Sequence, residues 1–207
     1  MVKYSEPSKE LFEFYQNEDG SYVVTDIIAK NIDHFEIPEG VVELNKKFEF
    51  DFDESKGTFE PKTVSFPSTL RKITGSVFVG NRRIKTLKIP GNVKYIGDGT
   101  FQQSDFKVVE FEEGIEVIDF AAFSFCNNIT EIIIPASCKM IGWRCFADCD
   151  ALKNVLIRDP KGWTKMKFDF DKHTHKKMLF GGVPESVLLD PRTAADFLTK
   201  DVAICKK

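Results

Sequence analysis

The stretch that decides the fold is LKIPGNVKYIGDGTF, residues 87–101, because its apolar positions recur along the chain at a fixed spacing. An isoleucine is followed five residues later by a phenylalanine, and four such pairs recur in the same phase. The pairs are Ile73 and Phe78, Ile96 and Phe101, Ile118 and Phe123, and Ile141 and Phe146. The isoleucines are separated by 23, 22 and 23 residues. A period of this length predicts a solenoid, in which each turn buries its apolar side against the next.

The same register extends beyond these pairs. A proline stands six residues before three of the isoleucines, and Glu112 takes that place in the turn of Ile118. The apolar columns begin near residue 35 and end in a partial turn at Val155 and Ile157. We therefore expect a mostly β solenoid of the α/β class. It should be a right-handed stack of about five and a half turns of 22–23 residues, which exceeds the roughly three repeats needed for stability.

The flanking segments do not carry the repeat and are expected to close its two ends. Residues 1–34 hold two apolar runs around the turn sequence Asn17–Gly20, which predicts a capping β-hairpin. Residues 35–160 form the solenoid, and residues 161–207 form a C-terminal cap of strand and helix. Asp190 followed by Pro191 predicts a helix start, and Ala194, Ala195 and Leu198 should face inward.

The repeat resembles the BspA-like, or Treponema pallidum type, leucine-rich repeat family. The resemblance rests on Leu87-x-Ile-Pro-x-x-Val-x-x-Ile-Gly-x-x-x-Phe101 and on Phe-x-x-Cys-x-x-Ile from Phe123 to Ile129. Ser104 and Asn81 stand near the cysteine position of their turns, where the chain departs from the pattern. The family is bacterial, phage-related and protozoan. The resemblance implies a protein-binding surface, a role in adhesion, and a location at the cell surface or outside the cell.

Composition excludes several other classes. The 207 residues carry a net charge of −3, which argues against a general nucleic-acid binder because such a protein needs a basic stripe. No apolar run approaches 18 residues, so we expect no membrane span. The start, Met1–Pro7, lacks the apolar core of a signal peptide. The sequence by itself thus predicts a soluble cytoplasmic chain, in contrast to the location that the family implies.

Catalysis and cofactors find no support in the motifs. There is no nucleophile elbow, phosphate loop or dinucleotide-binding glycine pattern, so we expect neither an enzyme nor a cofactor. One alternating stretch offers weak metal-ligand candidates: Asp169, Asp171, His173 and His175. In an extended strand these four would share one side, but they would span too far to close a tetrahedral site. We favour a solvated strand face there and predict no metal.

Five cysteines are present, and two of them, Cys126 and Cys149, occupy equivalent positions in neighbouring turns. We predict buried, reduced thiols that satisfy backbone groups of the loops. Cys138 falls in a core column and should act as a small apolar residue. A metal or redox pair formed by Cys145 and Cys149 would lack a second ligand pair.

The candidate binding residues are large apolar side chains in columns that earlier turns fill with smaller or charged residues. One column, just before the isoleucine, reads Lys72, Tyr95, Val117 and Met140, and another, two residues after it, reads Gly75, Asp98, Phe120 and Trp143. Arg144 adjoins Trp143, and Ile133 and Leu156 continue an outward column of the strand that ends at the proline. We expect these eight large residues, from Tyr95 to Leu156, to form a contact patch. The alternative is that the same side chains fold over the corner and join the core.

Three functions remain open from the sequence. The first is a protein-binding scaffold, with an adhesin or effector role, or with a second copy of the chain as its partner. The second is glycan binding, in which Trp143, Phe120 and Tyr95 stack on sugar faces. The third is a structural domain without a ligand. The fold alone does not choose between them.

Overall fold

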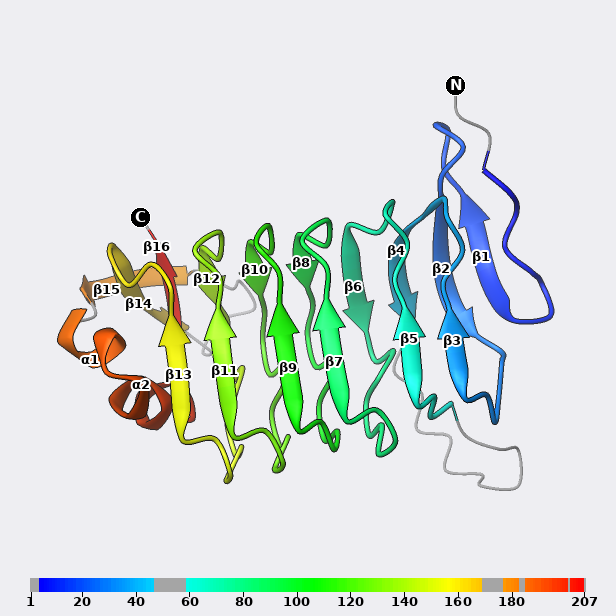
Figure 1. Ribbon diagram of the computed structural model, residues 1–207. Helices are drawn as coiled ribbons and strands as arrows, with labels where there is room; N and C mark the ends of the chain where they lie inside the picture. Colours follow the sequence, from blue (N-terminus) through cyan, green and yellow to red (C-terminus); the bar gives the residue numbers. More distant parts are fainter. Residues whose placement is uncertain (1–3, 47–58, 169–176, 183–184, 201, 207) are drawn as a thin grey trace.

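The computed structural model describes residues 4–46, 59–168, 177–182, 185–200 and 202–206. They form an elongated β-solenoid of about five turns with two short helices at its C-terminal end (Figure 1). Each regular turn contributes one longer strand to the front of the view and one shorter strand behind it. The core lies between these two rows of strands.

We call the strands of the front row the longer strands, because in the regular turns they have four residues and those behind them have two. They end just before or near the proline position, since proline has no N–H to donate to a ladder. They are β3 (His34–Glu36), β5 (Thr63–Ser65), β7 (Thr86–Ile89), β9 (Val108–Phe111), β11 (Glu131–Ile134) and β13 (Asn154–Ile157). All pairings in this row are parallel, but the row consists of two sheets. The strands β7, β9, β11 and β13 form a four-stranded sheet, and β3 and β5 form a separate pair.

We call the strands behind the front row the shorter strands, because in the regular turns they have two residues. Each places its apolar isoleucine, or Leu44 in β4, inward and the residue before it outward, as strand alternation requires. They are β4 (Val41–Lys46), β6 (Lys72–Gly75), β8 (Tyr95–Ile96), β10 (Val117–Ile118) and β12 (Met140–Ile141). Their parallel register aligns Tyr95 with Val117 and Val117 with Met140. The columns read from the sequence are therefore real columns of neighbouring residues.

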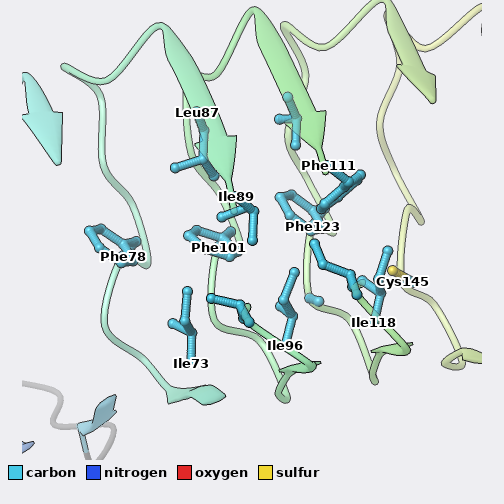
Figure 2. Close-up of a cluster of buried hydrophobic side chains, with 14 of the residues drawn as sticks. Ile73, Phe78, Leu87, Ile89, Ile96, Phe101, Phe111, Ile118, Phe123 and Cys145 are labelled. Carbon is cyan, nitrogen blue, oxygen red and sulfur yellow. The ribbon is translucent and has the colours of Figure 1, made fainter. Parts of the chain in front are cut away.

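A stack of phenylalanines fills the centre of the solenoid. Figure 2 shows Phe78, Phe101 and Phe123 in one row along the stack, between the isoleucines of the shorter strands and the apolar residues of the longer ones. The ring centroids of Phe78 and Phe101 lie 5.3 Å apart, those of Phe101 and Phe123 5.0 Å, and those of Phe123 and Phe146 5.8 Å. All three pairs are stacked, with interplanar angles of 15–20°. The predicted phenylalanine column is confirmed.

A second column satisfies the backbone of the turns that hold these rings. Cys126 donates its thiol hydrogen to the carbonyl of Phe101 at 3.2 Å, and Cys149 donates to that of Phe123 at 3.1 Å. Ser104 makes the same bond, from its hydroxyl to the carbonyl of Phe78 at 2.8 Å. Each donor thus reaches back one turn to a buried phenylalanine carbonyl. The carbonyls of Phe78 and Phe123 also accept a backbone N–H, from Asn81 and Cys126. The predicted role of Cys126 and Cys149 is confirmed, and Ser104 makes the equivalent hydrogen bond in its own turn.

The four thiols that the structure describes are neutral and form no disulfide. Cys126, Cys138, Cys145 and Cys149 are buried free cysteines. Burial raises the pKa of Cys138 and of Cys149 to about 12, because a thiolate would lose its hydration there. These residues act as small core side chains, as expected for Cys138.

The N-terminal end of the solenoid is closed by a hairpin. The strands β1 (Phe12–Gln16) and β2 (Tyr22–Ile27) pair antiparallel around a turn at Asn17–Gly20, and β2 continues into β4 in parallel. The hairpin extends the row of shorter strands and covers the first turn.

The C-terminal end reverses the strand direction. The strand β16 (Ala203–Lys206) pairs antiparallel with β12 and is followed in the sheet by β14 (Trp163–Phe168) and β15 (Lys177–Gly182). The helices α1 (Glu185–Leu189) and α2 (Pro191–Leu198) pack against β13. Asp190 caps α2 by accepting from the N–H groups of Arg192 and Thr193, and Ala194, Ala195 and Leu198 are buried. Both rows of strands are thus covered at this end.

The weak metal candidates Asp169, Asp171, His173 and His175 lie outside the described residues. Within the described part of the chain, no group of histidine, cysteine or acidic side chains is placed to hold a metal ion. No helix in that part has the length and apolar character needed to cross a bilayer.

Candidate functional site

The corner surface consists of Tyr95, Val117, Phe120, Met140, Trp143 and Arg144, from three successive turns. Tyr95, Val117 and Met140 stand side by side on β8, β10 and β12. Phe120 and Trp143 follow two residues after the isoleucines, where each shorter strand turns toward the phenylalanine stack. The structure thus brings together six of the eight residues that the sequence analysis grouped.

The other two candidates lie elsewhere. Ile133 and Leu156 are paired in register on β11 and β13, in the four-stranded sheet. Leu156 is 45% exposed and Ile133 is half-buried. This sheet forms the opposite row of strands from β8, β10 and β12 (Figure 1). The eight residues therefore form two surfaces rather than one, because column position alone does not say which row a column faces.

Exposure of the corner surface is intermediate between core and solvent. Phe120 is 37% exposed, whereas Tyr95, Val117, Met140, Trp143 and Arg144 are half-buried. For comparison, Phe123, three residues after Phe120, is 0% exposed. The corner side chains rest on the turns beneath them and keep one side in water.

The two aromatic rings of the corner are in contact. The ring centroids of Phe120 and Trp143 are 5.4 Å apart and the rings are tilted by 34°. Arg144 places its guanidinium carbon 5.7 Å from the centre of the Trp143 ring, a cation–π contact, and bonds to Asp148 at 2.7 Å. The result is a fixed aromatic platform with a cation at its C-terminal side.

A glycine makes this close approach possible. A Cβ at Gly142 would lie 2.4 Å from the carbonyl carbon of Asp119 and from the nitrogen of Phe120. Only a residue without a side chain lets the chain before Trp143 pass so close to the chain before Phe120.

Acidic residues border the opposite, N-terminal side of the platform. The Tyr95 hydroxyl donates to Asp119 Oδ2 at 2.5 Å, and Asp119 Oδ1 accepts the N–H of Phe120 at 2.8 Å. Burial and this bond to Asp119 raise the pKa of Tyr95, which stays a neutral donor. Asp98 is exposed and occupies the position of Phe120 one turn earlier. Desolvation and the nearby charge of Asp119 raise the pKa of Asp98.

Neither Asp98 nor Asp119 was among the predicted site residues. A signal for both was present, since Asp98 shares a column with Phe120 and Trp143, and Asp119 precedes Phe120. The bond between Tyr95 and Asp119 spans 24 residues of sequence and needed the structure.

Comparison with known proteins identifies the repeat. Residues 55–167 match the family model described as BspA type leucine rich repeat region, in six copies. No curated protein matches the chain.

Several solved structures are similar in fold. The pneumococcal vaccine antigen PcpA is 18% identical, covers 79% of this chain and superposes with a TM-score of 0.56. A leucine-rich repeat protein from Bacteroides ovatus is 21% identical, covers 75% of this chain and gives 0.53. One from Eubacterium ventriosum is 20% identical, covers 75% and gives 0.49. The chain spans 52%, 50% and 43% of these three structures. Because the family model matches more than half of its residues, this chain belongs to the BspA-type leucine-rich repeat family.

Proposed function

We propose that this chain is a non-enzymatic scaffold that binds a protein partner through the corner surface. Leucine-rich repeat solenoids of this kind generally serve as binding scaffolds, because a stack of rigid turns presents many side chains in fixed positions. The finer role as an adhesin or effector module rests on the resemblance to the family.

The observation that carries the proposal is the aromatic platform of Phe120 and Trp143. The equivalent position holds Gly75 and Asp98 in earlier turns, so packing of the turn does not require a large ring there. The platform nevertheless places two rings 5.4 Å apart with part of each residue in solvent. Covering such apolar area contributes roughly 25 cal/mol per Å² to association before entropy losses. Tryptophan and arginine are also the residues most often found to dominate binding energies.

The test compares Trp143→Ala and Phe120→Ala with the wild-type chain. Each biotinylated protein is used to capture partners from an extract of the source organism and of cells it contacts, followed by mass spectrometry. The control is Tyr15→Ala, which removes an aromatic side chain that is 53% exposed on β1, at the N-terminal edge of the same sheet. We expect one set of partners to be lost by both corner variants and kept by the control.

Two parallel measurements separate the remaining functions. Sedimentation analysis shows whether the corner variants lose self-association, and a glycan array shows whether they lose sugar binding. A melting temperature that collapses in Phe120→Ala, with no binding lost in any assay, would contradict the proposal and assign the corner to the core.

A further inference from the structure

We infer that the partner of the corner surface is a basic segment, whose lysine or arginine side chain crosses the Phe120 ring and ends at Asp98 and Asp119. This inference rests on the proposed function and adds the chemistry of the partner. It follows from the charges around the platform.

The two carboxylates are held beside the aromatic platform. Asp119 is fixed from two directions, by the Tyr95 hydroxyl and by the N–H of Phe120. Asp98 stands one turn before Phe120 in the same column, and neighbouring turns are about 4.8 Å apart. A side chain that lies on Phe120 therefore has both carboxylates within reach of its end.

The charge of this pair is not balanced within the described part of the chain. The nearby ion pairs join Lys72 on β6 to Glu43 on β4 at 3.7 Å, and Lys139, just before β12, to Glu116, just before β10, at 2.7 Å. Lys94 instead donates to the carbonyls of Gly91 and Gly114, both at 2.9 Å. None of the ion pairs between described residues includes Asp98 or Asp119. Desolvation and the like charge of Asp119 raise the cost of ionising Asp98, which a bound cation would offset.

The two ends of the platform are unlike, and this sets the orientation of the partner. Arg144 already supplies a cation over Trp143 and is paired with Asp148. The Asp98 end offers carboxylates next to the Phe120 ring. Lysine and arginine match this end, because their apolar stems pack on a ring while their charged heads form charge-assisted hydrogen bonds. An acidic segment or a polyanion would meet repulsion there.

The test uses selection from a random dodecapeptide phage library on the immobilised full chain. We expect the recovered peptides to be enriched in lysine or arginine flanked by apolar residues. Synthetic copies should bind about tenfold or more weakly to the double variant Asp98→Asn/Asp119→Asn, the loss of a hydrogen bond to a charged group. The amide keeps an oxygen for the N–H of Phe120, and thermal melting checks that the variant is folded.

The matched control is Glu110→Gln/Glu131→Gln, which removes two exposed carboxylates from the four-stranded sheet and should leave peptide binding unchanged. Neutral or acidic peptides that bind in a Trp143-dependent way, and bind the Asp98→Asn/Asp119→Asn variant equally, would overturn the basic segment and leave the proposed function standing. Failure to recover any peptide whose binding depends on Trp143 would overturn both.

Discussion

The phenylalanine stack and the corner column lie only a few residues apart in each turn, yet they follow opposite rules. The stack repeats one residue through Phe78, Phe101, Phe123 and Phe146, with centroids 5.0–5.8 Å apart and no contact with solvent. The corner column changes at every turn, through Gly75, Asp98, Phe120 and Trp143. A position enclosed by the turns before and after it must match both of them, whereas a position with one side in water need not. The molecule thus separates the residues that hold it together from those that can vary between turns.

The largest expected effect comes from removing one ring of the stack. Phe123→Ala should lower the free energy of unfolding by about 3–5 kcal/mol, because it empties a fully buried aromatic site between two other rings. Phe120→Ala, three residues earlier, should cost about 1 kcal/mol, since its ring is partly in water already. Urea unfolding of both variants measures the difference. Equal losses of unfolding free energy in the two variants would show that the corner column is as important for stability as the phenylalanine stack.

The next effect concerns the geometry of the corner itself. Gly142→Ala should cost about 2–3 kcal/mol, because its Cβ would meet backbone atoms of Asp119 and Phe120 that cannot move away freely. The matched control is Gly99→Ala, at a left-handed position with a φ of 58°, where the nearest atom is 3.6 Å from the added Cβ. Ala121 adopts the same conformation one turn later, so this change should cost about 1 kcal/mol.

Tryptophan fluorescence, to which Trp143 and Trp163 both contribute, provides a second readout for Gly142→Ala, because the Trp143 indole would move relative to Phe120. An emission spectrum and a stability equal to those of the wild type would show that the corner is not held by this close approach.

A smaller effect should appear at alkaline pH. Burial raises the pKa of the Cys149 thiol from 9.0 to about 12, so the folded chain keeps a proton that the unfolded chain loses. The contribution of this buried thiol to the free energy of unfolding is therefore fully present below about pH 8.5. It falls as the pH rises, by about 1.4 kcal/mol per pH unit for each such thiol. Cys149→Ser keeps a donor for the carbonyl of Phe123, as Ser104 does for that of Phe78.

Unfolding under reducing conditions at pH 8, 9 and 10 measures this slope. The serine variant should lose less stability between pH 9 and 10 than the wild type. A slope that is unchanged by the substitution would mean that this thiol ionises in the folded chain.

The smallest effect tests a buried hydroxyl beside the stack. Ser124 Oγ is buried and has no hydrogen-bond partner among the described residues, and Ala147 fills the same position one turn later. Ser124→Ala should leave stability unchanged or raise it by up to about 1 kcal/mol, because it removes an unsatisfied polar group. Ser104→Ala, which breaks a bond to Phe78, should instead lower it by about 1 kcal/mol. Calorimetric melting distinguishes the two signs.

Much of this fold could be predicted because stacking forces the sequence to repeat. Three features depend on neighbours at fixed separations and can therefore be recognised in the sequence. They are the isoleucine and phenylalanine columns, the cysteine contacts and the helix start at Pro191. The antiparallel return of β16 onto β12 was not, because it joins residues 65 apart that share no pattern, Cys205 with Met140. The division of the longer strands between two sheets was equally hidden.

The site was predictable only in part, because the repeat fixes which residues are neighbours but not how exposed each side chain is. The phase of Tyr95, Phe120 and Trp143 places them correctly at one corner. Phase does not say how far a side chain rises from the turn, so the half-buried state of Trp143 had to be observed. It also cannot show that Ile133 and Leu156 face away from the other six, since the assignment of a column to a row depends on where the chain bends.

The reversed strand at the C-terminal end also controls how this molecule can change in length. The cap strand β16 occupies the edge of β12 on which another turn would stack, so growth must occur between the two caps, one whole unit of 22 or 23 residues at a time. Each added unit lengthens the rod by about 4.8 Å and leaves both ends intact. A unit inserted between β10 and β12 would separate Phe120 from Trp143 and so remove the contact between their rings, while the phenylalanine stack would continue through the new unit. Recombination between repeats can therefore exchange one set of corner side chains for another at little cost to folding.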